Sequence, residues 1–310
     1  MNMRLSLQCN DRFEDSMKYS LHAQRFAAWL LQVGEGKINE GSKVILPSGI
    51  SSLKLFKLNS DLCLPLSDSP IDQIIDKVYD GIEAIENLPE FMQQDYFGER
   101  AILSPLNCDV DELNDRCISR LSGISKTFLS IDVAINETGY HDYSVPKEYL
   151  NTINLSGLPR HSIIIKLGCP IILLRNLDRS AGLCNGTRLI VVAFAERVIQ
   201  ARILSGIHRG KYAFIPRISI STTASSGLPF TLRRHQFPFQ VAFNMSINKS
   251  QRQSLLHIGI YLHTPVFAHG QLYVALSRAT DHRNIYISLS SHDIIRQTDN
   301  IVYSEVLQST

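Results

Sequence analysis

The spacing of apolar and polar positions changes along the chain, and each spacing predicts a type of element. Residues 22–31 place Phe26, Trp29 and Leu30 on one face, which predicts a helix that packs on a core. A longer amphipathic pattern predicts a second helix over 71–86. Short apolar runs predict strands at 100–105, 128–132, twice within 163–176, and at 189–194, 198–204 and 213–218.

The stretch 237–290 shows the sharpest changes of pattern. Apolar and polar residues alternate over 237–245 and predict one strand, which runs into the polar cluster 248–254. A strand over 255–262, a helix over 270–279 and a strand over 284–289 are predicted to follow. Residues 100–114 likewise predict a strand and then a capped helix. Strands that alternate with helices indicate a parallel α/β sheet.

The composition is that of a packed protein, with 44% hydrophobic and 19% charged residues. The six cysteines form no CxxC pair and have no histidines at zinc spacing, so we predict no metal site and a reducing compartment. The longest apolar run, 163–174, is interrupted by Lys166 and is too short to span a bilayer. We therefore expect an intracellular, soluble protein without a membrane partner.

Positive charge is concentrated in one segment, although the whole chain carries only +2. Residues 179–252 hold 11 Lys and Arg and a single acid, Glu196. Residues 1–178 hold 17 Lys and Arg against 24 Asp and Glu. Such a basic segment predicts a polyanionic partner. The alternative is that it balances the acidic part of the same chain.

Two short runs carry candidate chemistry for phosphate groups. Residues 246–251 read Ser-Ile-Asn-Lys-Ser-Gln, and residues 273–278 read Tyr-Val-Ala-Leu-Ser-Arg. A lysine with hydroxyl neighbours can hold phosphate oxygens, and an arginine at a helix end can bind one bidentately. These runs, in this order and with Lys249 and Arg278 29 positions apart, resemble motifs V and VI of superfamily 1 DNA helicases. The match is to the PIF family, including its Helitron-transposon relatives.

The resemblance implies roles for individual residues. Arg278 would stabilise charge on a transferring phosphoryl group, as would Arg4, because residues 2–5 resemble the end of another family motif. Residues 183–189 resemble the entry motif of a small barrel-like insertion, and residues 103–114 resemble a loop that touches nucleic acid. Asn107 and Asn114 would then either contact DNA or be structural. The implied nucleotide-binding residues are Gln271, Gln253 and Ser254, and the implied nucleic-acid-binding residues are Lys249, Ser250, Gln251, Asn248, Ser246, Asn107 and Asn185.

The resemblance also implies the fold. It is a second RecA-like α/β domain, with a parallel sheet, over 1–179 and 235–310, carrying a small β-barrel insertion over 180–234. The run 36–43 has glycines at P-loop spacing, but Ser42 precedes Lys43, whereas a P-loop needs Gly-Lys-Ser/Thr. No other P-loop is present, so ATP and Mg²⁺ would bind only together with a P-loop domain supplied in cis or in trans.

The function implied is the C-terminal part of an ATP-dependent 5′-to-3′ DNA helicase, inactive by itself. Besides the P-loop domain, its partner would be single-stranded or forked DNA. It would act in the nucleus, or alternatively in mitochondria, in DNA repair, recombination or telomere maintenance. Two other classes stay open: a non-enzymatic nucleic-acid-binding remnant of a transposon-related helicase, and a structural protein without a ligand. One departure from the family matters, because Arg252 stands where the family has glycine.

Overall fold

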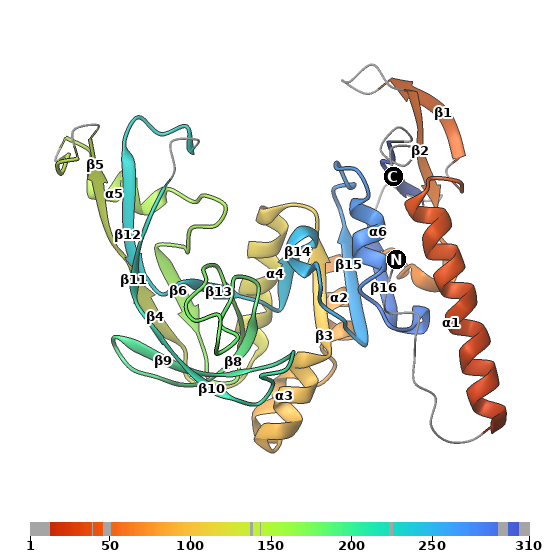
Figure 1. Cartoon of the computed structure of the whole chain (residues 1–310), viewed down its shortest axis with the longest axis horizontal. Coiled ribbons are helices and arrows are strands. Elements are labelled where there is room, and N and C mark those ends of the chain that lie inside the picture. Colours follow the sequence, from red (N-terminus) through yellow and green to blue (C-terminus); the bar gives the residue numbers. More distant parts are fainter. Residues whose placement is uncertain are drawn as a thin grey trace. The chain divides into compact units, whose positions relative to one another are not determined.

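The computed structural model describes residues 13–38, 40–45, 51–136, 139–142, 144–222, 226–290 and 297–303 (Figure 1). The chain divides into two compact units. The first, here called the α/β unit, comprises Met1–Asp80, Glu99–Val110 and Met245–Thr310. The second, here called the β-rich unit, comprises Gly81–Gly98 and Asp111–Asn244.

The α/β unit contains most of the described helices and all three strands that pair in parallel. In chain order its elements are α1 (Phe13–Gly34), β1 (Glu40–Ile45), β2 (Ser51–Lys57), η2 (Ser60–Leu62), α2 (Pro70–Val78), β3 (Arg100–Ser104), the start of α4 (Asn107–Arg120), β14 (Asn244–Ser246, which begins at the boundary), η5 (Ile247–Ser250), β15 (His257–Leu262), α6 (Gln271–Leu276), η6 (His282–Asn284), β16 (Ile285–Leu289) and β17 (Gln297–Asp299).

The core of this unit is a four-stranded sheet in the order β14-β3-β15-β16. Strand β15 runs parallel to both β3 and β16. Its residues from Ile258 to Leu262 are buried, as expected for a strand covered on both faces. Helix α2 packs on β15 and β16 with its apolar stripe, Ile74, Ile75 and Val78, turned inward. The predicted α/β class with a parallel sheet is thus confirmed.

The helix predicted over 22–31 is confirmed as part of α1, which ends at Gly34. Trp29 stacks on Phe26 at 5.8 Å between ring centroids and lies 6.2 Å from the ring of buried Phe56 on β2. Trp29 is therefore a packing residue. Strands β1, β2 and β17 form a separate three-stranded sheet in that order.

The β-rich unit is built mainly from antiparallel strands. Its elements are η3 (Ile82–Asn87), α3 (Glu90–Gly98), the rest of α4, β4 (Lys126–Leu129), β5 (Ile131–Ile135), α5 (Lys147–Thr152), β6 (Ser162–Ile165), β7 (Pro170–Leu173), β8 (Arg188–Phe194), β9 (Val198–Ile203), β10 (Tyr212–Pro216), β11 (Ile218–Ser221), β12 (Thr231–Gln236) and β13 (Phe239–Val241).

These strands form three sheets within the described residues: β10-β9-β8-β7-β13, β11-β12-β5 and β4-β6. Strands predicted at 189–194, 198–204 and 213–218 are confirmed as β8, β9 and β10. They share a sheet with β7 and β13, which lie outside 180–234. The bounds of the barrel insertion stay a prediction. No helix in the described ranges is long and apolar enough to cross a membrane.

Three sequence predictions are wrong in detail. The helix over 71–86 is two elements, because α2 stops at Val78 and Gly81 adopts a left-handed φ of 73° before η3 begins. The strand over 237–245 is split into β13 and β14, which join different sheets. The strand over 128–132 is likewise split at Ser130 into β4 and β5. In each case apolar spacing continues across a bend, because both sides of the bend face a core.

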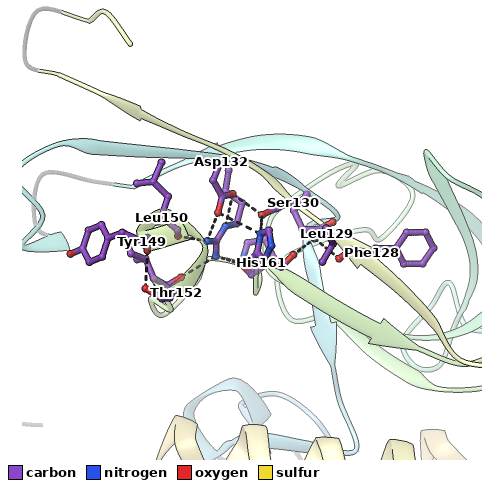
Figure 2. A network of polar contacts seen from close by, with 12 residues as sticks. Phe128, Leu129, Ser130, Asp132, Tyr149, Leu150, Thr152 and His161 are labelled. Carbon is purple, nitrogen blue, oxygen red and sulfur yellow. Dashed lines mark hydrogen bonds and ion pairs between the residues drawn. The ribbon is translucent and has the colours of Figure 1, made fainter. Parts of the chain in front are cut away.

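A buried ion pair connects the strands of the β-rich unit with the segment 147–161. The Arg234 side chain on β12 is fully buried, and its Nε and Nη2 donate to the Asp132 carboxylate on β5 at 2.9 and 2.6 Å. Its Nη1 and Nη2 also donate to the backbone carbonyls of Leu150, Ile153 and Pro159 at 2.9 to 3.1 Å. Figure 2 shows Asp132 and Leu150 converging on these donors.

Two further polar side chains, Ser130 and His161, lie beside this ion pair. Ser130 Oγ donates to Asp132 at 2.6 Å and lies 2.8 Å from His161 Nδ1 (Figure 2). Arg234 lies 75 to 102 positions from each of its partners, so the network fixes how these segments meet.

Candidate functional site

Strand β14 leads directly into the polar cluster that the sequence singles out. Ile247 and Ser250 are fully buried and anchor the 3₁₀ turn η5, in which Ser250 Oγ donates to the Ile247 carbonyl at 2.7 Å. Asn248 between them is exposed and Lys249 is half-buried. The turn therefore presents a lysine from a rigid base that packs against α6 and β3.

The turn continues through Arg252, which has a φ of 69°. Among the described residues it is the only non-glycine with a positive φ. A left-handed conformation costs a side-chain-bearing residue about 1–2 kcal/mol. This is the strain expected from the comparison with the family, in which glycine holds this position.

We expect Arg252→Gly to raise the free energy of unfolding by about 1 kcal/mol, because glycine adopts this φ without strain. The measurement is urea unfolding of both proteins. Arg252→Ala is the matched control: it removes the charge, keeps the strain and should leave stability unchanged. A loss of stability in Arg252→Gly would show that the Arg252 side chain makes a stabilising contact.

Helix α6 carries the second motif and is held close to its neighbours. It follows Gly270, and it buries Leu272, Ala275 and Leu276. A Cβ on Gly34 of α1 would lie 3.0 Å from the Tyr273 ring, so α1 approaches α6 closely. These contacts leave the orientation of α6 little freedom.

Arg278 lies just beyond the end of α6 and reaches back to the Lys249 loop. Its Nε donates to the Val274 carbonyl at 2.9 Å, its Nη2 to Ser277 Oγ at 2.8 Å, and its Nη1 to the Gln253 carbonyl at 3.3 Å. The Leu255 amide donates to the Arg278 carbonyl at 3.1 Å. The tertiary structure thus joins the two motifs through the Arg278 guanidinium.

Gln253 occupies the point where the two motifs meet. Its carbonyl accepts from Arg278, its amide donates to the Ser250 carbonyl at 3.0 Å, and its Nε2 lies 3.5 Å from the Lys249 carbonyl. Its buried Oε1 has no hydrogen-bond partner within the part of the chain that the structure describes. A buried acceptor without a donor is costly, and it fits a hydroxyl, amine or water supplied from outside the chain.

Other charged groups border this region of the α/β unit. The Asp281 carboxylate accepts from the Arg283 amide and guanidinium at about 3 Å, and Arg283 lowers the pKa of Asp281. At the start of β15, burial and then the nearby Arg100 charge lower the pKa of His257 below 6.5. Both groups therefore keep their neutral-pH charge state, with Asp281 ionised and His257 uncharged.

The remaining predicted residues take different places. Ser246, Gln251 and Ser254 lie in the same loop as Lys249, and Asn107 is exposed at the start of α4. Gln271 is buried, and its Oε1 accepts from the Phe267 and Ala268 amides at 3.0 and 3.2 Å. Asn185 belongs to the β-rich unit, and Arg4 lies outside the described residues. Ligand roles for all of these stay predictions.

Asn114 has a structural position instead. It is buried, its Nδ2 donates to the Val241 and Asn244 carbonyls at 3.1 and 2.9 Å, and its Oδ1 accepts from the Asn244 amide at 2.8 Å. It fixes the bend between β13 and β14. The sequence pattern did not predict this bend, because the side chain that holds it lies 130 positions away from Asn244.

The basic segment 179–252 offers less surface charge than its composition indicates. Three of its eleven basic side chains, Arg188, Arg202 and Arg234, are at least 91% buried. Arg234 in particular neutralises Asp132 and is not available to a ligand. Fewer than eleven basic side chains of this segment can therefore reach a polyanion, and a polyanionic partner stays a prediction.

Residues 36–43 do not form a phosphate-binding loop. Gly36, with a φ of 67°, follows helix α1, and Lys43 lies within strand β1. A P-loop runs in the opposite order, from a strand into a helix N-terminus. Among the described residues there is also no cluster of three or more His, Cys, Asp or Glu side chains that could hold a metal ion.

The site is thus defined by a parallel sheet of an α/β unit with Lys249 and Arg278 in adjoining loops. A family model described as "DNA helicase Pif1, 2B domain" matches residues 148–194. Human ATP-dependent DNA helicase PIF1 is 35% identical over 174 residues, which is 55% of this chain and 24% of that protein. The mouse protein is 31% identical over 198 residues, covering 63% and 28%.

The crystal structure of the Pif1 helicase from Candida albicans has the same fold, with a TM-score of 0.50 and 19% identity over 78% of this chain and 57% of that one. Over part of its length the chain is thus similar to PIF-family DNA helicases. It spans about a quarter of the length of the curated relatives it matches. The matched segment 148–194 includes the carbonyls of Leu150, Ile153 and Pro159 that bind Arg234.

Proposed function

We propose that the chain is the part of an ATP-dependent 5′-to-3′ DNA helicase that supplies an arginine finger and contacts to single-stranded DNA. Arg278 is the finger and the Lys249 loop is the DNA contact. The observation that carries the proposal is the hydrogen bond from the Arg278 guanidinium to the Gln253 carbonyl, because it connects the two loops physically.

Coupling between nucleotide and DNA follows from this connection. When the Arg278 guanidinium turns toward a phosphoryl group, it gives up or shares the Gln253 carbonyl, and the backbone that follows Lys249 is released. Lys249 is a compact cation suited to a phosphate of the DNA backbone. A change at the nucleotide phosphoryl group would therefore be transmitted to the DNA phosphate at Lys249 through these few contacts.

The residues of this chain fit one side of a bound nucleotide. Arg278 suits a phosphoryl group, and the unpartnered Gln253 Oε1 suits a hydroxyl or amine donor. The described residues provide nothing that fits Mg²⁺. The metal and the β- and γ-phosphates would be held by a P-loop domain, in cis or in trans, and ATP hydrolysis belongs to that complete enzyme.

We expect the chain by itself to release no phosphate from ATP, with or without single-stranded DNA, because its sequence contains no P-loop. A coupled phosphate assay on the purified chain makes the measurement, and Arg278→Ala serves as the background. DNA-stimulated phosphate release above that background would contradict the proposal that ATP hydrolysis requires a separate P-loop domain.

We further expect weak binding to single-stranded DNA, with a Kd on the order of 10⁻⁴–10⁻⁶ M near physiological salt, little sequence preference and a steep loss of affinity with salt. Lys249→Ala should weaken every sequence alike and reduce the salt slope by about one. Fluorescence anisotropy with a labelled oligonucleotide at several salt concentrations tests this.

The matched control is Lys37→Ala, which removes a lysine of the same unit paired with Glu35 in the turn after α1. It should leave both affinity and salt slope unchanged. Binding that does not respond to salt would mean that the basic residues serve other parts of the chain.

A second candidate function is a nucleic-acid-binding remnant without a catalytic partner. The strained Arg252 favours it, since the chain carries an unfavourable residue in a motif loop. The two candidates differ in one result: a remnant binds DNA, but addition of a P-loop half from a relative yields no Arg278-dependent ATP hydrolysis. Localisation to the nucleus or to mitochondria stays a prediction.

A further inference from the structure

Strand β10 forms an edge of the five-stranded sheet of the β-rich unit (Figure 1). It carries two exposed aromatic side chains. Tyr212 is 52% and Phe214 is 65% exposed, whereas Ala213 and Ile215 between and after them are buried. Residues two apart on a strand point to the same face, about 7 Å from each other. The two rings therefore lie side by side on the solvent face of this sheet.

The rest of this face leaves the ring of Phe214 open. In the strand register Phe214 lies opposite Gln200 of β9, and Gln200 lies opposite Ala193 of β8. Gln200 is half-buried, and the Ala193 side chain is small and exposed. Neither residue in register with Phe214 is aromatic, and 65% of Phe214 is exposed, so a flat group can lie on its ring.

The ring of Tyr212 is held in place by contacts at its hydroxyl end and on its face. Its hydroxyl lies 3.2 Å from a carboxylate oxygen of Glu90, and the Arg202 guanidinium lies 5.9 Å from the ring centroid. Arg202 donates to the Glu90 carbonyl at 2.5 Å and lies 3.3 Å from its carboxylate. The Glu90 charge is thus matched by Arg202, and the aromatic face is pre-organised rather than free to rotate.

Charge decides what kind of molecule suits this face. The exposed side chains of Arg197 and Lys211 belong to the loops that adjoin β9 and β10. Glu196, the one acid of the segment 179–252, is paired with Lys126 at 2.7 Å, and Lys126 lowers the pKa of Glu196. Exposed aromatic rings with Arg197 and Lys211 in the adjoining loops favour a partner that is both flat and anionic.

We propose that Tyr212 and Phe214 form a stacking platform for the unpaired bases of single-stranded nucleic acid. The proposal rests on the function proposed above and adds a second contact to it, in the other compact unit. Bases stack on aromatic side chains whatever their identity, while basic groups follow the phosphates. The platform would thus bind bases, whereas the Lys249 loop would bind the backbone.

The test compares two labelled oligonucleotides of equal length, oligo(dT) and a fully abasic strand, by anisotropy on the full chain at low salt. Phe214→Ala should weaken oligo(dT) binding about five- to tenfold, leave the salt slope unchanged and have no effect on the abasic strand. Phe214→Trp should restore or exceed the original affinity. Tyr140→Ala, which removes a 74% exposed aromatic residue of the same unit, is the control and should change nothing.

The result also separates this proposal from the previous one. If Lys249→Ala weakens binding and Phe214→Ala does not, the platform is overturned and the backbone contact stands. If Phe214→Ala weakens only oligo(dT) and Lys249→Ala has no effect, the platform stands and the Lys249 contact falls. An equal effect of Phe214→Ala on both strands, or no binding of either strand, overturns the platform.

Discussion

Removal of the Asp132 carboxylate should destabilise the protein by about 3–5 kcal/mol, the largest effect we expect of any single substitution. Arg234 is fully buried, and Asp132 accepts from both its Nε and Nη2. In Asp132→Ala the guanidinium charge stays buried without a counter-ion. Arg234→Met should cost a similar amount, because it leaves the buried carboxylate without its counter-ion and removes the guanidinium donors from three backbone carbonyls.

The neighbouring residue provides the control for this prediction. Arg233 is exposed on the opposite face of β12, so Arg233→Met should change the free energy of unfolding by less than about 0.5 kcal/mol. Urea unfolding, with each transition followed separately because the chain has two compact units, makes the comparison. Equal effects of Arg233→Met and Arg234→Met would mean that the ion pair stabilises little.

The double variant Asp132→Ala/Arg234→Met distinguishes charge burial from packing. It contains neither charge, so its loss of stability should be smaller than the sum of the single losses. Strict additivity would mean that the two side chains contribute independently and that the 2.6 Å contact between them is not the cause.

Gly259→Ala should destabilise the α/β unit by about 1–3 kcal/mol, through overpacking rather than backbone strain. Gly259 lies on β15 between Ile102 of β3 and Tyr286 of β16. A Cβ there would lie 2.8 Å from Val78 Cγ2 and 3.0 Å from Ile74 Cδ1 on α2. Helix α2 would have to move away from the sheet to make room.

A double-mutant cycle with Val78 tests that cause. Val78→Ala removes the atom that the new Cβ would meet, so Gly259→Ala should cost clearly less in that background. Thermal or urea unfolding of the four proteins gives the coupling energy. An unchanged cost would show that the glycine is required for a reason other than the approach of α2.

Much of the local structure could be predicted from the sequence, because apolar spacing and turn residues report it directly. The order of strand and helix over 100–114 and 255–289 predicted β3, α4, β15, α6 and β16, and with them a parallel sheet. The runs around Lys249 and Arg278 carried the resemblance to PIF-family helicases, and the similarity to human PIF1 supports that resemblance. A glycine expected at position 252 correctly indicated a left-handed turn there.

Only the tertiary structure decided which side chains meet. Arg234 and Arg233 are alike in sequence, yet one is buried against Asp132 and the other faces solvent. Asn114 holds a bend 130 residues later, and Gly259 makes room for α2. Apolar spacing shows which face of an element is buried, but not what lies against it. That depends on contacts between segments far apart in the chain, which form only when the whole fold does.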